Sequence, residues 1–420
     1  MNDERARIPF HRPSIGEEEI AAVTAVLRSG WLTSGAECAR FEEELAAFVG
    51  ARHAVAVSSC TAALHLALEA AGVRRADRVL VPTFTFAATA EVVAHLGAQP
   101  VLVDCEPRTL NLDVRAAERI ASELEAGRTV PGVAVPGPAA AIVPVHYAGQ
   151  MADVDGVGLI ARRHGLRVIE DAAHALPAFA RVPVSSEGGE QTRWRSVGTT
   201  AEQTCFSFYA NKTITTGEGG MLVTNDAELA ARARSMSLHG LSKDAWSRFA
   251  AHGSWDYQIV AAGHKYNLTD LAAALGRAQL KKAAGFAQAR AEIAARYREL
   301  LGAVDELELP EVSPDRVSAW HLYVARLRLE RLAIDRAAFV EELGRAGIGV
   351  SVHWRPLHLH AYYRDRYALK PGDFPVASAE WARCISLPIF PGLTERELER
   401  ICNVVKDLSR RHARARAARG

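Results

Sequence analysis

The sequence predicts an α/β fold in which helices cover both faces of a large, mainly parallel sheet. Short apolar segments alternate with amphipathic segments over the first two thirds of the 420 residues. The expected strands are His53–Val57, Val79–Val81, Pro100–Val103, Ala141–Val145, Arg167–Ile169, Thr204–Phe208 and Met221–Thr224. The intervening segments carry apolar residues at three- and four-residue spacing, which is typical of helices; they are Thr61–Ala71, Ala87–Leu96 and Asp153–His164. Alternation of this kind favours parallel strands joined by helices.

The last third of the chain follows a different pattern. From Asn267 to about Ala303 the sequence consists almost entirely of helix-forming residues. Beyond it we expect, in order, a strand, a helix, a strand and two helices: Trp320–Leu329, Arg336–Ala346, Gly347–Val352, Ser378–Arg383 and Thr394–Arg411. We therefore predict two domains. Residues 1–285 form an N-terminal segment and the large domain, and residues 286–420 form a smaller α+β domain.

Two stretches interrupt this order and are expected to be mobile surface loops. Residues 127–138 are rich in Gly, Pro and Val. Residues 183–200 are rich in Ser, Gly, Thr and charged residues. Both compositions are typical of irregular connections at the surface.

Composition and charge argue against several classes of protein. The formal net charge is +1, so no overall field favours nucleic acid or a membrane surface. No apolar stretch is long enough to span a bilayer, and the first residues lack the apolar run of a signal peptide. The six cysteines form no Cys-x-x-Cys pair, which disfavours a metal site or a disulfide framework. We expect a cytoplasmic protein with reduced thiols and no metal.

The strongest candidate for chemistry is Lys212, a few residues beyond the short aromatic strand Thr204–Phe208. A glycine-rich stretch, Gly217–Gly220, follows it and permits close backbone packing. A lysine at such a turn can form a Schiff base with an aldehyde cofactor. Ser207, at the end of the strand, can donate its hydroxyl to a phosphate. The alternative is a surface lysine beside a turn.

A second candidate is Asp171, at the end of the strand Arg167–Ile169. A pyridoxal-phosphate (PLP) enzyme needs an acid beside the pyridine nitrogen, because the protonated ring accepts electrons from the substrate. His174, three residues further on, could reach the phenolic oxygen of the cofactor. The alternative is an aspartate that caps a helix, with an incidental histidine.

Two further strand ends complete a possible cofactor site. At Ser58–Ala63 a strand turns into a helix, and free N–H groups and hydroxyls at a helix N-terminus suit a phosphate. In Pro82–Thr89 an aromatic side chain could stack on a flat heterocycle. Alone, the first is an ordinary helix cap and the second is core packing. Together with Lys212 and Asp171, they place a phosphate turn, an aromatic ring, an acid and a lysine in that order along the chain, each at the end of an expected strand.

The sequence resembles the DegT/StrS-type nucleotide-sugar aminotransferases, which share the aspartate-aminotransferase fold (PLP fold type I). The resemblance extends from Pro9 to about Val405, and its most specific segments are Ser29–Gly35, Glu170–Ala175, Phe206–Gly220 and Gly263–Asp270. It implies a ping-pong reaction through a Schiff base of Lys212, in which L-glutamate gives its amino group first. Family members that act as sugar dehydratases carry histidine in place of this lysine, so Lys212 favours transamination.

By position, the resemblance also assigns roles to individual residues. It implies that Asp171 binds the pyridine nitrogen and that Phe86, rather than Phe84, stacks on the ring. It implies a phosphate site made by Thr61, Ala62 and Ser207. Asn267 matches an asparagine that reaches the phosphate in the neighbouring subunit, which implies a homodimer with shared active sites. The substrate-facing loops of the family correspond to segments that contain Trp31, Thr33, His321 and His353.

Within the family, the resemblance is strongest to the transaminases that make UDP-4-amino-4-deoxy-L-arabinose, through Pro144–Gly149, Ala319–Leu322 and Leu387–Pro391. It implies amination at C4 of a UDP-linked keto pentose. Tyr209 stands where those enzymes have histidine, and Cys60 replaces a small residue. These departures leave open a different 4-keto or a 3-keto nucleotide sugar, and lipid A, O-antigen or antibiotic sugar synthesis as the pathway. Other PLP enzymes, such as an amino-acid transaminase or a desulfurase, and a non-catalytic sensor are the alternatives.

Overall fold

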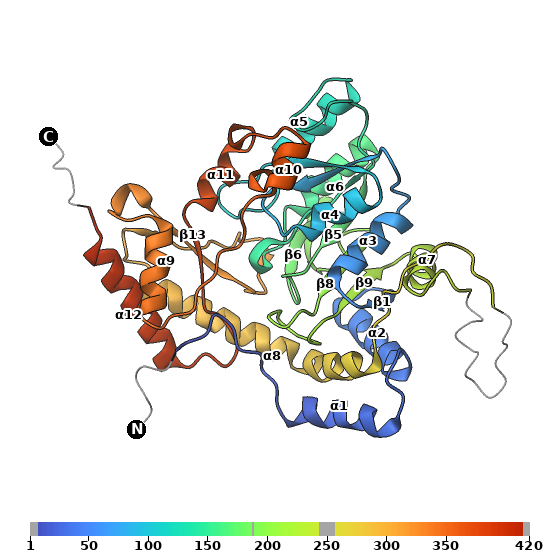
Figure 1. Ribbon diagram of the computed structural model, residues 1–420, viewed down its shortest axis with the longest axis horizontal. Coiled ribbons are helices and arrows are strands. Elements are labelled where there is room, and N and C mark those ends of the chain that lie inside the picture. The colour runs from blue at the N-terminus through green and yellow to red at the C-terminus, as the bar shows by residue number, and fades with distance from the viewer. Residues whose placement is uncertain (1–6, 187–188, 243–256, 415–420) are drawn as a thin grey trace.

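The computed structural model describes residues 7–186, 189–242 and 257–414, and its centre is a seven-stranded sheet (Figure 1). The order is β1 (His53–Val57), β9 (Gly220–Thr224), β8 (Gln203–Ser207), β5 (Arg167–Asp171), β4 (Ala141–Ile142), β2 (Arg78–Pro82) and β3 (Gln99–Val103). Only β9 runs antiparallel to its neighbours, whereas β8, β5, β4, β2 and β3 pair in parallel. The predicted mainly parallel sheet is confirmed.

Helices cover both faces of the sheet because successive strand residues point to opposite sides. Val55 and Val57 of β1 face one core with α3 (Cys60–Ala70), α4 (Ala88–His95) and α7 (Ala227–Ser237). Ala54 and Ala56 face the opposite core, with α2 (Ala36–Val49) and the first half of α8 (Asp270–Leu301). The helices α5 (Val114–Glu125) and α6 (Val154–His164) pack on this second face further along the sheet.

The smaller domain is built on a three-stranded antiparallel sheet, in the order β10 (Leu307–Glu308), β12 (Tyr323–Leu327) and β13 (Cys384–Leu387). It packs against α9 (Arg336–Arg345) and α12 (Glu395–Arg411). The helix α8 joins the two domains, and the predicted boundary near residue 285 lies inside it. Ala283 and Phe286 belong to the core of the large domain, whereas Ile293 and Tyr297 belong to that of the small domain. This change along one helix supports the division, which stays a prediction.

The prediction of a loop at 183–200 was wrong for most of its length. Strands β6 (Phe179–Ser186) and β7 (Gly189–Ser196) form a hairpin, and β11 (Arg316–Val317) pairs with β6. The buried side chains of Ala180 and Val182 alternate with exposed Arg181, which is the period-two signal of a strand. In β7 the side chains from Gln191 to Trp194 are exposed and mostly polar, so the composition of the strand resembled that of a loop. Residues 127–138 contain no helix or strand, as expected.

The strand predicted at Gly347–Val352 was also wrong. Only single bridges occur there, from Ile348 to Ile8 and from Ser351 to Ser386. Gly347, with a φ of +78°, belongs to the turn that follows α9, and β13 occupies the expected position in the small sheet. Helices α1 (Glu17–Ser29), α10 (Ala361–Arg366) and α11 (Pro375–Trp381) were not expected at these positions, although the predicted Ser378–Arg383 overlaps the last of them. No helix among the described residues is long and apolar enough to cross a membrane.

Residues 357–378 leave the small domain and pack on the large one. Figure 1 shows α10 beside α4 and α5, away from α9 and α12. The end of α11 still contacts α9, where the Arg336 guanidinium lies 4.2 Å from the centre of the Trp381 ring. Leu357, Tyr363 and Phe374 belong to the core under α3 and α4. Asp104, directly after β3, caps α11 by accepting from the backbone N–H groups of Val376 at 3.0 Å and Ala377 at 2.9 Å. The two domains are therefore joined by more than α8.

We expect Asp104→Ala to destabilise the protein by about 2 kcal/mol, because three partly buried N–H groups lose their acceptor. The measurement is the urea midpoint of unfolding at unchanged slope. Asp335→Ala is the matched control, since Asp335 is exposed and caps α9 through the single N–H of Ala338. It should lower stability by roughly half as much. Equal losses for the two variants would contradict a joining role for Asp104.

Candidate active site

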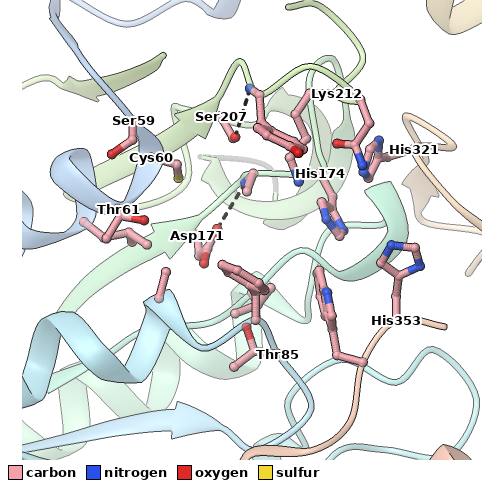
Figure 2. A pocket seen from close by; sticks show the side chains of 18 of the residues that line it. Ser59, Cys60, Thr61, Thr85, Asp171, His174, Ser207, Lys212, His321 and His353 are labelled. Carbon is pink, nitrogen blue, oxygen red and sulfur yellow. Dashed lines mark hydrogen bonds between the residues drawn. The ribbon is translucent and has the colours of Figure 1, made fainter. Parts of the chain in front are cut away.

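A cavity of about 340 Å³ opens at the carboxyl ends of β5 and β8, beside the N-terminus of α3. In Figure 2, Ser59, Cys60 and Thr61 lie at one end and His321 and His353 at the other. Lys212 and Asp171 lie between these two ends. Ligands of parallel α/β sheets bind at this edge. Nine of the predicted site residues line the cavity: Thr61, Phe86, Asp171, His174, Ser207, Tyr209, Lys212, His321 and His353.

Lys212 reaches the cavity from a tight turn after β8. Its backbone N–H donates to the carbonyl oxygen of Tyr209 at 2.9 Å. Burial lowers the pKa of Lys212 from 10.5 to about 8, although the charges of Cys60 and Asp171 oppose this shift. At pH 7 about one amine in ten is therefore neutral, which is the nucleophilic form.

The glycine-rich stretch after Lys212 lets two chain segments pass in direct contact. A Cβ at Gly220 would lie 2.4 Å from the backbone carbon of Ser59. Only glycine fits, so β9 can begin directly against the turn that starts α3. This contact brings the turn at Ser59 close to the end of β8, where Ser207 lies.

Asp171 is the last residue of β5 and is held by two donors. The Thr89 hydroxyl donates to Oδ2 at 2.9 Å, and the backbone N–H of Ala173 donates to Oδ1 at 3.1 Å. Burial raises the pKa of Asp171 despite these hydrogen bonds. A cation bound in the cavity would reverse this shift, because opposite charges favour the ionised carboxylate.

One end of the cavity, lined by the hydroxyl groups of Ser59, Thr61 and Ser207 and called the hydroxyl end, lies at the start of α3. Ser59 caps the helix by accepting from the N–H of Ala62 at 3.0 Å. Thr61 and Ser207 line the cavity nearby. Ala62 is buried and does not line it, and its N–H is engaged by the cap. The free N–H groups and hydroxyls suit an anion at this helix N-terminus.

The opposite wall carries aromatic and imidazole rings. The ring of His174 lies 4.2 Å from that of His321 and stacks on Trp354 at 4.8 Å, between ring centroids. Burial, and then the charges of Lys212 and the neighbouring histidines, keep the pKa values of His174 and His321 well below the ordinary value. Burial lowers the pKa of His353 to about 4. Three neutral imidazoles therefore face the cavity.

The structure separates the two candidate stacking aromatics. Phe84 is buried and packs against Tyr147 in the core, with ring centroids 5.4 Å apart. Phe86 is 58% exposed, lines the cavity and lies near Trp354. Of the two rings, that of Phe86 can therefore meet a ligand in the cavity, and its stacking role stays a prediction.

Three predicted residues lie outside the cavity and group together at the start of α8. Asn267 donates from Nδ2 to the hydroxyl of Ser34 at 2.7 Å. Trp31 donates from Nε1 to the carbonyl oxygen of Ser34 at 3.1 Å, and the carbonyl of Thr33 accepts from the N–H of Asp270. None of the three lines the site of its own chain.

Several lining or supporting residues were missed in the sequence. Trp354 stands about 180 residues from Asp171 and has no motif that marks it. Thr85 and Thr89 hydrogen-bond to each other beneath Asp171 at 2.8 Å. Thr85 precedes α4 and Thr89 lies in its first turn, so no helical spacing in the sequence marked the pair.

These residues fit PLP. Lys212 offers an amine that is partly neutral, and Asp171 offers a buried carboxylate that has no cation in hydrogen-bond contact among the described residues. His174 has an unpaired buried Nδ1. The hydroxyl end suits a phosphate, and Phe86 lines the same cavity. No group of three His, Cys, Asp or Glu side chains within the described ranges is placed to hold a metal ion.

A lysine and a carboxylate that face one cavity at the edge of a mainly parallel sheet are the protein groups of a PLP-dependent aminotransferase of fold type I. Residues 13–406 match the DegT/DnrJ/EryC1/StrS aminotransferase family, and the chain belongs to this family of PLP-dependent sugar aminotransferases. The resemblance read from the sequence motifs is confirmed.

Individual relatives agree with this assignment. The spore coat polysaccharide biosynthesis protein SpsC of Bacillus subtilis is 42% identical over 96% of this chain and 97% of its own length. The putative sugar aminotransferase Spr1654 of Streptococcus pneumoniae in its PLP form is 29% identical, with a TM-score of 0.83 over 96% and 99% of the two chains. Helicobacter pylori PseC, an aminotransferase of pseudoaminic acid biosynthesis, is 27% identical, with a TM-score of 0.82 over 96% and 100%.

We expect the rate at which the PLP-free protein captures PLP to rise about tenfold between pH 6 and 7 and to level off above pH 8, because the neutral amine of Lys212 is the attacking form. The measurement is the growth of the visible absorption band after rapid mixing. Nα-acetyl-lysine is the control, since its ordinary amine should still gain in rate above pH 9. A protein profile that keeps rising to pH 10 would contradict the lowered pKa.

Proposed function

We propose that this protein transfers the amino group of L-glutamate to a keto group, at C4, of a sugar carried by a nucleotide. The observation that carries the proposal is the placement of Lys212 and Asp171 in one cavity, with a hydroxyl end on one side and three imidazoles on the other. Relatives named for polysaccharide and amino-sugar synthesis support a sugar as the acceptor.

In this proposal each residue of the cofactor site has one task. Bound PLP supplies an aldehyde that carries the amino group between substrates and a ring that accepts electrons. The Asp171 carboxylate, oriented by Thr89 and Ala173, holds a proton at the pyridine nitrogen. Thr61 and Ser207 bind the phosphate, with Ala62 fixing the cap at Ser59. Phe86 covers the ring.

Lys212 moves the proton. Its Nζ, lowered in pKa to about 8, takes a proton from Cα of glutamate and later returns one to the carbon that receives the amino group. The reach of the side chain and its position between the two ends of the cavity suit both steps. Oxoglutarate leaves before the keto sugar binds in the same cavity, and this order of release and binding makes the sequence ping-pong.

The sugar is proposed to bind at the imidazole end. His321 and His353 offer neutral ring nitrogens for sugar hydroxyls, and Tyr209, which is 48% exposed, lies at the rim where the nucleotide would extend. Trp31 and Thr33 would approach this rim only from a second subunit, since neither lines the cavity of its own chain.

We propose a homodimer whose active sites are shared. The support is the exposed position of Trp31, Thr33 and the neighbouring Leu32, together with the absence of Asn267 from the residues that line the cavity of its own chain. In the dimer, Asn267 would reach the phosphate of the partner. We also propose a cytoplasmic location, supported by six unpaired cysteines, five of them buried.

We expect PLP to give the wild-type protein a visible absorption band that L-glutamate removes, leaving the shorter-wavelength absorption of the amino form. Lys212→Ala should not form the normal band, because the Schiff-base amine is missing. The control is Lys281→Ala, which removes an exposed lysine of α8 outside the cavity. A band that is independent of Lys212 would refute the assignment. A Lys212-dependent band that glutamate leaves unchanged would refute glutamate as the donor.

The acceptor is tested with the glutamate-reduced protein and a panel of nucleotide sugars. We expect 4-keto sugars to restore the visible band and yield a 4-amino product by mass spectrometry. The matched 3-keto sugars are the control for position. If only 3-keto sugars restore the visible band, the carbon that receives the amino group is C3 and the proposal of C4 is wrong.

Shared sites predict complementation between two inactive variants. Lys212→Ala and Asn267→Ala should each be strongly impaired alone. After random mixing, half of the dimers are hybrids, and each has one site with both residues intact, so activity should reach about a quarter of wild type. If Asn267 serves its own chain, no hybrid site is complete and mixing should restore nothing.

A further inference from the structure

Arg290 is a buried cation that the reaction proposed above does not use. It lies in the middle of α8 and is 1% exposed. Its Nη1 donates to three backbone carbonyl oxygens, those of Ile389 at 2.7 Å and of Trp320 and His321 at 3.3 Å each. Its Nε and Nη2 are buried without a hydrogen-bond partner among the described residues.

The charge of this guanidinium persists at neutral pH. Burial lowers the pKa of Arg290 to about 10, and no carboxylate among the residues that the structure describes opposes this shift. A buried charge without an anionic partner is unfavourable. Among the described residues, only the three carbonyl dipoles offset the loss of hydration of the guanidinium. The arrangement therefore ties the charge to these three carbonyl groups.

The backbone that Arg290 contacts is under strain and is clamped from the opposite side. Trp320 has a φ of +47°, which is unfavourable for a bulky side chain. Ala319 and Leu322 donate their N–H groups to the carbonyl oxygens of Gly149 and Ala148. A Cβ at Gly149 would lie 2.8 Å from the Trp320 nitrogen, so only glycine permits this approach. Residues 319–322 are thus held between the large domain and α8.

The segment carries His321 into the cavity. The groups that face the His321 ring are the rings of His174 and His353, the Lys212 amine and the Arg290 guanidinium. Burial first, and then these charges, hold the pKa of His321 well below its ordinary value. Its Nδ1 is unpaired.

We propose that Arg290 is a positioning residue that fixes the backbone at Trp320 and His321 and disfavours a charge on the His321 ring, so that a neutral imidazole meets the acceptor. The proposal rests on the proposed function only in its last step, the contact between His321 and the sugar. The clamp and the effect of the charge belong to the protein itself.

Two substitutions separate the clamp from the charge. Arg290→Gln can still donate to the carbonyl groups but carries no charge, whereas Arg290→Lys keeps a charge without the planar fork. Arg298→Gln is the matched control, since Arg298 is exposed on the same helix. The readout is the titration of His321 by NMR in PLP-loaded protein with ¹⁵N-labelled histidine, assigned with His321→Asn.

We expect the midpoint of His321 to rise by about one pH unit, a tenfold change in proton affinity, in Arg290→Gln. It should stay unchanged in Arg290→Lys and Arg298→Gln. In both Arg290 variants we expect kcat/KM for the acceptor sugar to fall by tenfold or more. In Arg290→Gln, the acidic limb of the pH profile of this kcat/KM should also move to higher pH. An unmoved His321 midpoint in folded Arg290→Gln would overturn the effect of the charge. Unchanged acceptor kinetics in Arg290→Lys would overturn the clamp.

If Arg290→Gln fails to fold, a normal His321 midpoint and wild-type acceptor kinetics in Arg290→Lys would still refute the clamp. An upward shift of that midpoint in Arg290→Lys would refute the effect of the charge. The titration needs no acceptor sugar, so it also stands if every nucleotide sugar proves inactive. That result would refute the proposed function. The effect of Arg290 on His321 would still be decided by the titration.

Discussion

The enclosure of Lys212 and Asp171 in one cavity is the constraint on which the rest of the site depends. Burial drives the amine and the carboxylate toward their neutral forms, and both shifts arise because charge is unfavourable in a poorly solvated space. A neutral amine is what a nucleophile requires, whereas the carboxylate requires a cation beside it. The same enclosure therefore favours the neutral, nucleophilic amine of Lys212 without any ligand. The ionised form of Asp171, in contrast, depends on a bound pyridinium.

The sheet and its flanking turns impose this enclosure. Parallel pairing of β5 and β8 places Asp171 and Ser207 at one edge, and the contact at Gly220 places the start of α3 beside them. The remaining wall comes from the other domain, through His321, His353 and Trp354. Residues 357–378 and the cap from Asp104 hold that wall against the large domain. The cavity therefore encloses both groups between the edge of the sheet and this wall.

The sequence was sufficient for the parts of the site that depend on local order along the chain. Asp171 and Ser207 end their strands, and Thr61 and Lys212 come a few residues after a strand. Because strand ends in a parallel sheet meet at one edge, the strand pattern predicted that these residues lie close together. Trp354 and Arg290 could not be found in this way, because their positions depend on packing between segments far apart in sequence. The hairpin at residues 179–196 was missed for a related reason, since backbone pairing rather than composition holds its exposed strand.

The same distinction separates the two halves of the proposed reaction. The cofactor and donor chemistry relies on strand ends of a single domain, which are rigidly set by sheet pairing. The acceptor is met by side chains from segments whose positions depend on α8, on the 319–322 clamp and, in the proposed dimer, on a second subunit. Substitutions in these outer segments can alter the imidazole wall without disturbing Lys212 or Asp171. The choice among sugars is therefore expected to depend on these outer segments. Arg290 connects them to the cavity at the edge of the large sheet, because it holds residues 320 and 321.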